Sequence, residues 1–169
     1  MEVFESGAAD RISKCGNIAV VVIDDAGKAV DLAKALLEGG VDVMELTLRT
    51  DCAIDAIAGI ASQVPDMLVG AGTVLTVEQL RKSRDAGAAF AVAPGFNPEI
   101  VRAAIEMRFS FAPGVMTPSE IEGALGLGCR LLKYFPAGAL GGLKAMKALV
   151  APYDHLGLRY IPLGGMTPE

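Results

Sequence analysis

Aromatic residues and clusters of positive charge are scarce in this 169-residue sequence, which has no tryptophan and only 5% Phe, Trp and Tyr together. Few aromatics leave few platforms on which nucleic-acid bases could stack. The net charge is −5 without a cluster of Lys or Arg, which argues against nucleic acid or an anionic membrane as a partner. No apolar run reaches about 18 residues, so no segment is predicted to span a bilayer. We therefore expect neither a nucleic-acid nor a membrane partner.

Cysteine and histidine, the side chains that most often bind zinc, are also few. Cys15, Cys52 and Cys129 are odd in number and widely spaced without a CxxC motif, which argues against a disulfide framework or a zinc site. His155 is the single histidine, and we interpret it as a surface residue. Segment 1–14 is acidic and mixed, unlike a signal peptide. These features predict a protein of the reducing cytoplasm without a bound metal.

Apolar residues and a repeated unit are what the sequence has in abundance. Hydrophobic residues make up 52% of it, enough for one domain with a substantial core. Short apolar segments alternate with segments whose apolar residues recur at i, i+3 and i+4. Strands are predicted at 17–23, 41–49, 67–74, 88–95, 109–115, 129–136 and 158–165, and helices at 26–40, 51–63, 76–87, 97–107, 117–128 and 141–153. This alternation favours a parallel sheet with helices outside it.

The second predicted strand, VDVMELTLR, separates an open sheet from a barrel. Its alternate residues form one apolar and one polar face: Met44, Leu46 and Leu48 against Glu45, Thr47 and Arg49. A central strand of an open parallel sheet is apolar on both faces. A barrel strand packs its outer face on helices and can hold polar groups inside, near the mouth. The predicted fold class is therefore α/β, a (β/α)8 TIM barrel.

The predicted domain is a single β/α barrel over residues 1–169, with an N-terminal helix at about 1–15 covering the bottom. Seven strands are recognisable in the sequence, whereas a barrel of this type needs eight. The chain apparently ends after the seventh strand, so we expect the C-terminal β/α unit to be missing or its strand to be supplied in some other way. An open sheet edge would then remain beside the first and seventh strands, which predicts lower stability.

A lysine in the apolar segment LLKYFP is the strongest functional signal. Leu132 and Tyr134 should face the helices, so Lys133 should share the interior with Glu45. Burial disfavours an ammonium group, and a neutral amine forms a Schiff base with a carbonyl compound. A nearby carboxylate can carry the protons that this chemistry requires, and Arg49 is placed for bidentate binding of a substrate carboxylate. The three residues predict an aldolase acting on a 2-keto acid.

Each of these residues also has a structural interpretation. Lys133 and Glu45 could form a buried ion pair, and Glu45 could belong to a polar layer of the barrel. Arg49 near a strand end could be an ordinary surface residue, and Thr73 a β-branched strand residue. Convergence of these side chains on one mouth is what favours the catalytic interpretation.

Two further pairs of residues could line the same mouth. Gly164 and Gly165 end the seventh predicted strand before a helix start, where free N–H groups can bind a phosphate. Tight turn chemistry explains the two glycines equally well. Pro94 and Phe135 lie at strand ends and could wall a keto-acid site, or could be turn and core residues.

The sequence motifs closely resemble those of the 2-keto-3-deoxy-6-phosphogluconate (KDPG) / 4-hydroxy-2-oxoglutarate (KHG) aldolase family. The motifs that carry the resemblance, from about residue 18 to the end, are GGVDVMELTLRT, LVGAGTVLTVEQL, APGFNPEIV, FAPGVMTPSEIEGALGLG, LLKYFPAGALGG and PLGGMTPE. The resemblance implies a β/α barrel and a metal-free class I aldolase without a cofactor, usually a homotrimer. It also implies that KDPG is split to pyruvate and glyceraldehyde 3-phosphate, and KHG to pyruvate and glyoxylate.

Matching the motifs residue by residue gives each candidate a role that the resemblance implies. Lys133 would be the Schiff-base lysine and Glu45 the general acid/base. The substrate-binding residues would be Arg49 and Thr73 at the pyruvyl carboxylate, Pro94 and Phe135 along the wall, and Gly164 and Gly165 at the phosphate.

The sequence departs from the family pattern at several positions. Gly138 stands where the family motif F-F-P-A-E has an acid, and Leu163 replaces the threonine of P-T-G-G. Leu163 favours an alternative, a related aldolase that prefers another 2-keto-3-deoxy sugar acid. The absent eighth strand favours a second alternative, a catalytically silent barrel that serves as an oligomeric scaffold. A third is another phosphate-binding barrel, such as an epimerase or synthase, which would not need Lys133.

Overall fold

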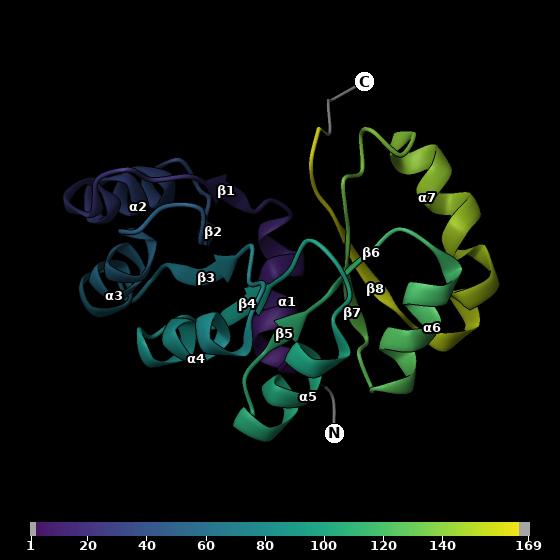
Figure 1. Ribbon diagram of the computed structural model, residues 1–169. Helices are drawn as coiled ribbons and strands as arrows, with labels where there is room; N and C mark the ends of the chain where they lie inside the picture. The colour runs from purple at the N-terminus through teal and green to yellow at the C-terminus, as the bar shows by residue number, and fades with distance from the viewer. Residues whose placement is uncertain (1–2, 166–169) are drawn as a thin grey trace.

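The computed structural model describes residues 3–165, which form parallel strands with helices packed outside them (Figure 1). The strands are β1 (Ala19–Val21), β2 (Val43–Thr47), β3 (Leu68–Gly72), β4 (Phe90–Val92), β5 (Phe111–Ala112), β6 (Gly114–Val115), β7 (Leu131–Tyr134) and β8 (Arg159–Pro162). The helices are α1 (Ser6–Cys15), α2 (Ala29–Glu38), α3 (Ala53–Gln63), α4 (Val77–Asp85), α5 (Pro98–Met107), α6 (Pro118–Gly126) and α7 (Gly142–Val150), with 3₁₀ turns η1 (Ala26–Lys28) and η2 (Ala151–Leu156).

The strands are hydrogen-bonded in chain order. β1 to β5 form a five-stranded sheet and β6 to β8 a three-stranded sheet, and every pairing is parallel. β5 and β6 are two parts of the fifth predicted strand, separated at Pro113, which has no N–H to donate. The Pro113 carbonyl still accepts the Lys133 N–H at 2.9 Å. β7 is therefore hydrogen-bonded to the residue that joins the two parts, in addition to its pairing with β6. The predicted α/β class with consecutive parallel strands is confirmed.

Alternate residues of the strands belong to two different apolar clusters. An outer cluster lies between strands and helices and includes Met44 and Leu46 of β2 and Leu132 of β7. A second set, which we call the inner cluster, lies on the other face of the strands. Its members are Phe4, Ala8, Ala9, Ile12, Val43, Phe90, Val92, Ala112, Leu131 and Ile161. The predicted parity of the second strand is therefore the one that the structure has.

Helix α1 packs on the inner cluster and is held at the amino ends of the strands. The rings of Phe4 and Phe90 lie 5.9 Å apart between centroids. Arg11 donates to the Asp42 carboxylate at 2.9 Å, directly before β2, and also contacts the carbonyl oxygen of Asp66, in the turn that leads into β3. Because these acceptors precede β2 and β3, α1 covers the amino ends of the strands, within the predicted 1–15 range.

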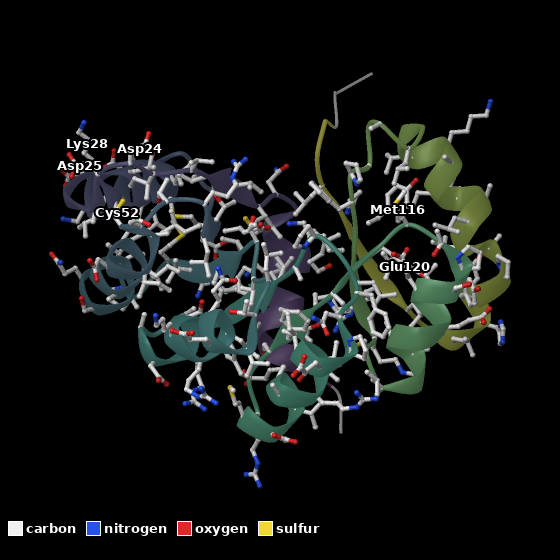
Figure 2. All side chains as sticks on the ribbon, viewed as in Figure 1. Asp24, Asp25, Lys28, Cys52, Met116 and Glu120 are labelled. Atoms are coloured by element: carbon white, nitrogen blue, oxygen red, sulfur yellow. The ribbon has the colours of Figure 1, made fainter. Side chains whose placement is uncertain are left out.

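Three helices that follow strands begin at residues whose side chains cap the first helical turn. Thr76, Asn97 and Thr117 each accept a backbone N–H of the first helical turn, from Gln79, Glu99 and Glu120 respectively. At α6 the Glu120 carboxylate also accepts the Met116 N–H at 2.9 Å, and Figure 2 shows these two residues together at the start of the helix. The caps fix the start of α4, α5 and α6 a few residues after the strand that precedes each helix.

The helices of residues 3–165 are short, between 9 and 11 residues for the α-helices. Within this part of the chain, none of them has the length and apolar character needed to cross a membrane.

Candidate active site

Lys133 and Glu45 meet inside the fold although they are 88 residues apart in the sequence. The Lys133 Nζ donates to the Glu45 Oε1 at 2.9 Å and lies 3.3 Å from Oε2. The two side chains are only 6% and 1% exposed. An amine and a carboxylate in this contact can exchange a proton without a rearrangement of either side chain.

The alternation of the two strands explains why these side chains face each other. On β2, Val43 belongs to the inner cluster and Met44 to the outer cluster, so Glu45 projects to the inner face. On β7, Leu131 lies in the inner cluster and Leu132 in the outer one. Lys133 therefore projects to the same interior as Glu45, at the carboxyl end of its strand, as the parity argument predicts.

Arg49 lies outside β2, which corrects the predicted extent of that strand. β2 ends at Thr47, and Arg49 is an exposed residue of the following turn. Its Nε donates to the Thr47 Oγ1 at 3.3 Å, and that hydroxyl donates to the Val21 carbonyl at 3.2 Å. The guanidinium is thus held on the interior side of β2 by a buried threonine. The sequence alone did not predict this role of Thr47. The feature that could have indicated it is the position of a polar side chain between Glu45 and Arg49 on the same face of the strand.

Thr73 also lies outside its predicted strand, because β3 ends at Gly72. Its φ is 59°, in the left-handed region, and its side chain is half-buried. A β-branched residue rarely adopts this conformation, which costs on the order of 1–3 kcal/mol. Hydrogen bonds on both sides hold it: the Gly72 carbonyl accepts the Leu48 N–H, and the Val74 N–H donates to the Val92 carbonyl. Strain of this kind collects at functional sites.

Phe135 and Pro94 lie at two other strand ends. The Lys133 Nζ is 5.2 Å from the centroid of the Phe135 ring, within the range of a cation–π contact. Pro94 follows β4 and is half-buried. It lines a groove of about 240 Å³ that Leu75 and Phe96 also line. The structure therefore brings the Phe135 ring to the amine and puts Pro94 on the rim formed by the loops after β3 and β4.

Gly164 and Gly165 form a turn that is bonded to the loop after β7. Their φ angles are 91° and 71°, a conformation that glycine adopts without strain. The Gly138 N–H donates to the Gly164 carbonyl at 2.8 Å. A Cβ on Gly138 would lie 2.1 Å from the Gly165 carbonyl oxygen, so only glycine allows this approach. At Gly138, where the family motif has an acid, the backbone thus lies directly against Gly165, and the turn lies close to Phe135.

The remaining candidates for metal or redox chemistry lie apart from this site. His155 is exposed in η2, as predicted, and Cys15, Cys52 and Cys129 are free thiols. Burial raises the pKa of Cys129 to about 12, which keeps that thiol protonated. Within residues 3–165 no three His, Cys, Asp or Glu side chains come close enough to hold a metal ion.

Fold and site together define a class of protein. It is a parallel α/β protein in which a buried lysine contacts a carboxylate at the carboxyl ends of the strands, where such folds bind their ligands. A lysine amine beside a proton carrier is the arrangement that carbonyl addition requires.

Comparison with known proteins shows the family within this class. Residues 9–169 match the family model of KDPG and KHG aldolases, so the chain belongs to that family, and the resemblance seen in the sequence is confirmed. The KHG/KDPG aldolase of Escherichia coli K12 is 44% identical over 162 residues, which cover 95% of this chain and 75% of the relative. The chain is thus a member of a lyase family.

Two solved structures of KDPG aldolases share the fold. The Zymomonas mobilis ZM4 enzyme, solved with 3-phosphoglycerate, has a TM-score of 0.84 and 39% identity, covering 89% of this chain and 71% of that one. The Legionella pneumophila enzyme, with pyruvate captured as a covalent carbinolamine intermediate, has a TM-score of 0.83 and 40% identity, covering 88% and 71%.

Proposed function

We propose that this protein is a class I aldolase that cleaves KDPG to pyruvate and glyceraldehyde 3-phosphate through a Schiff base on Lys133. Cleavage of KHG to pyruvate and glyoxylate belongs to the same proposal. The observation that carries it is the buried contact of 2.9 Å between the Lys133 amine and the Glu45 carboxylate. The E. coli relative is named KHG/KDPG aldolase, which supports both substrates.

The proposed reaction uses Lys133 as nucleophile and Glu45 as proton carrier. The neutral amine adds to the C2 ketone, and loss of water gives the iminium ion. A base then removes the proton of the C4 hydroxyl, and the C3–C4 bond breaks as its electron pair forms the C2–C3 enamine. The aldehyde leaves, C3 is protonated, and addition of water returns pyruvate and the free amine. Glu45 is in hydrogen-bond reach of the reacting nitrogen, which suits it to these transfers.

The other predicted residues receive substrate-binding roles in this proposal. Arg49, held by Thr47, would bind the pyruvyl carboxylate together with Thr73. Phe135 would cover the keto acid beside the amine, and Pro94 would wall the rim. The N–H groups at Gly164 and Gly165 would bind the phosphate.

Borohydride trapping tests the proposal directly. The protein is incubated with pyruvate and sodium borohydride, and its mass and peptides are then measured. We expect a reduced adduct on Lys133 and none in a Lys133→Ala variant. Lys144→Ala, which removes an exposed lysine of α7, is the matched control and should still be labelled. A wild-type protein that acquires no adduct on Lys133 would contradict the proposal.

A second candidate function follows from Leu163. Its side chain is apolar, half-buried and packed against the inner cluster, next to Gly164. Where the family usually has a hydroxyl, this chain offers no hydrogen bond, which suits a related aldolase with another 2-keto-3-deoxy sugar acid as substrate. Turnover of phosphorylated and unphosphorylated keto acids by wild-type protein and Leu163→Thr distinguishes the two. A higher kcat/KM of wild-type protein for another sugar acid than for KDPG would establish the second function.

The finer predictions on architecture belong to the same proposal. A β/α barrel that forms one domain over residues 1–169, a homotrimer and a cytoplasmic location follow from the family resemblance and are parts of this proposal. The contrary hypothesis is a silent scaffold, which predicts a stable oligomer without pyruvate release. A lactate-dehydrogenase-coupled assay with KDPG, combined with light scattering, separates the two hypotheses.

A further inference from the structure

Gly72 lies where a side chain would collide with Glu45. A Cβ built on Gly72 would be 2.0 Å from the Glu45 Oε1 and 2.6 Å from both Cδ and Cγ of that side chain. Ordinary contacts between heavy atoms lie near about 3.5–4.0 Å. The carboxyl group of Glu45 therefore rests directly on the backbone of β3, in space that any other residue at position 72 would occupy.

The backbone at this position does not itself require glycine. Gly72 lies in β3 in regular parallel pairing with Thr47 of β2, and its carbonyl accepts the Leu48 N–H at 2.8 Å. Its φ is not among the left-handed angles that mark glycines of the turns, such as Gly87 and Gly164. An alanine could adopt this strand conformation, so the need for glycine comes from the Glu45 side chain, which supplies the three atoms nearest to an added Cβ.

The collision has a consequence at the amine because both Glu45 oxygens face Lys133. The carboxylate leans from β2 across β3 and reaches Nζ at 2.9 and 3.3 Å. A methyl group at position 72 would push Oε1 by about 1 Å or more to reach ordinary contact distance. Such a displacement changes the hydrogen bond to the amine, since hydrogen bonds weaken steeply with distance and angle.

We propose that Gly72 is a positioning residue of the aldolase site, whose missing side chain sets where the Glu45 carboxylate stands relative to the Lys133 amine. This inference rests on the proposed Schiff-base function. It assigns to the second glycine of GAGTV a role in proton transfer, not in strand geometry. Misplacement of a reacting group by about 1 Å can cost on the order of 10²-fold in rate.

Gly70 supplies a matched control on the same strand and the same face. A Cβ on Gly70 would lie 2.4 Å from the Phe90 ring, which belongs to the inner cluster. Gly70→Ala and Gly72→Ala thus add the same methyl group to β3, one against an apolar ring and the other against the catalytic carboxylate. Both should lower the urea midpoint of unfolding, because overpacking destabilises a close-packed interior.

The experiment measures pyruvate formation from KDPG across pH, and the urea midpoint, for wild-type protein, Gly72→Ala, Gly70→Ala, Glu45→Ala and Glu45→Ala/Gly72→Ala. We expect Gly72→Ala to lower kcat by about 10- to 100-fold and to change its pH profile, whereas Gly70→Ala keeps the wild-type profile. In the Glu45→Ala background the collision partner is gone. Gly72→Ala should then cause no further loss of rate or of urea midpoint.

Two outcomes would overturn the inference. The first is a Gly72→Ala variant with the wild-type kcat and pH profile. The second is a loss from Gly72→Ala that is equally large in the Glu45→Ala background, as for independent sites. If Gly72→Ala proves too unstable to assay, recovery of the urea midpoint in the double variant supports the inference, and no recovery contradicts it. A wild-type protein that is not trapped by pyruvate and borohydride refutes the proposed function instead, while the coupling of positions 45 and 72 in stability stays measurable.

Discussion

The inner cluster and the Lys133–Glu45 pair occupy the same face of the same strands, yet they differ in chemistry. β2 contributes Val43 to the cluster and Glu45 to the pair, and β7 contributes Leu131 and Lys133. All four residues are buried. The cluster gains stability from burial in proportion to apolar area, whereas an ion pair must overcome the desolvation of two charges. Along each strand, only two residues thus separate a position of the inner cluster, which stabilises the fold, from a position of the ion pair, which the proposed reaction needs.

The largest effect is expected from Lys133→Met. This change removes the nucleophile and should lower pyruvate formation from KDPG on the order of 10⁴- to 10⁶-fold. It also leaves a buried carboxylate unpaired, which costs about 3–5 kcal/mol of unfolding free energy. Adding Glu45→Gln should restore much of the stability and none of the activity, as measured by urea unfolding and a coupled pyruvate assay. Activity that returns with the second substitution would show that the pair is structural only.

Phe90→Ala tests the other side of the comparison. The ring packs between Gly70 and Phe4 in the inner cluster and is fully buried. Its loss should cost about 3–5 kcal/mol in unfolding free energy. Trapping of pyruvate on Lys133, expressed per folded molecule, should persist because no atom of the pair is removed. A Phe90→Ala variant with wild-type stability that no longer traps pyruvate would show that the ring serves the Lys133–Glu45 site and not the stability of the inner cluster.

Thr73→Gly should separate stability from activity at the mouth. Glycine adopts the left-handed conformation at φ 59° without strain. The free energy of unfolding should therefore rise by about 1 kcal/mol, which is the strain relieved less the extra entropy that glycine loses on folding. The loss of the hydroxyl should raise the KM for the keto acid. Thr73→Ala is the control, because it loses the hydroxyl but keeps the Cβ and therefore the strain. Equal stability of the Gly and Ala variants would argue against strain at this position.

The smallest effect is expected at the helix-covered end, at Asp42. A hydrogen bond from the Cys15 thiol, followed by the Arg11 guanidinium, holds the pKa of Asp42 below its usual 3.8. A carboxyl whose pKa is lower in the folded state stabilises the fold above its unfolded pKa, and this contribution disappears as the pH falls through the folded pKa. Asp42→Asn should therefore lose stability at pH 7 and differ less from wild type near pH 3. Urea midpoints at both pH values check this, and a constant difference would contradict it.

Several features of the fold and site were predictable because they depend on local order. The parity of β2 and β7 is a property of any extended strand, so the inward direction of Glu45 and Lys133 could be read from alternation. The helix caps at Thr76, Asn97 and Thr117 were predictable for a similar reason, because the cap and its N–H donor lie within three residues.

Other features depended on contacts between distant segments and were predicted wrongly or missed. β2 and β3 end earlier than the sequence indicates, which places Arg49 in an exposed turn and Thr73 in the loop after β3. Pro113 divides the fifth strand. The space that Gly72 leaves for the Glu45 side chain of β2 could not be predicted from local propensity. The sequence indicates it only through the alternation of glycines in the motif GAG.

The sequence by itself determined which residues face inward and where strands and helices alternate, because side-chain direction and capping are set by neighbours along the chain. Only the tertiary structure decided that the Lys133 amine lies 2.9 Å from the Glu45 carboxylate. The carboxylate occupies space beside β3 that is free because Gly72 has no side chain. A contact across 88 residues depends on how the strands curve and pack. That geometry follows from close packing of the whole interior and not from any single segment.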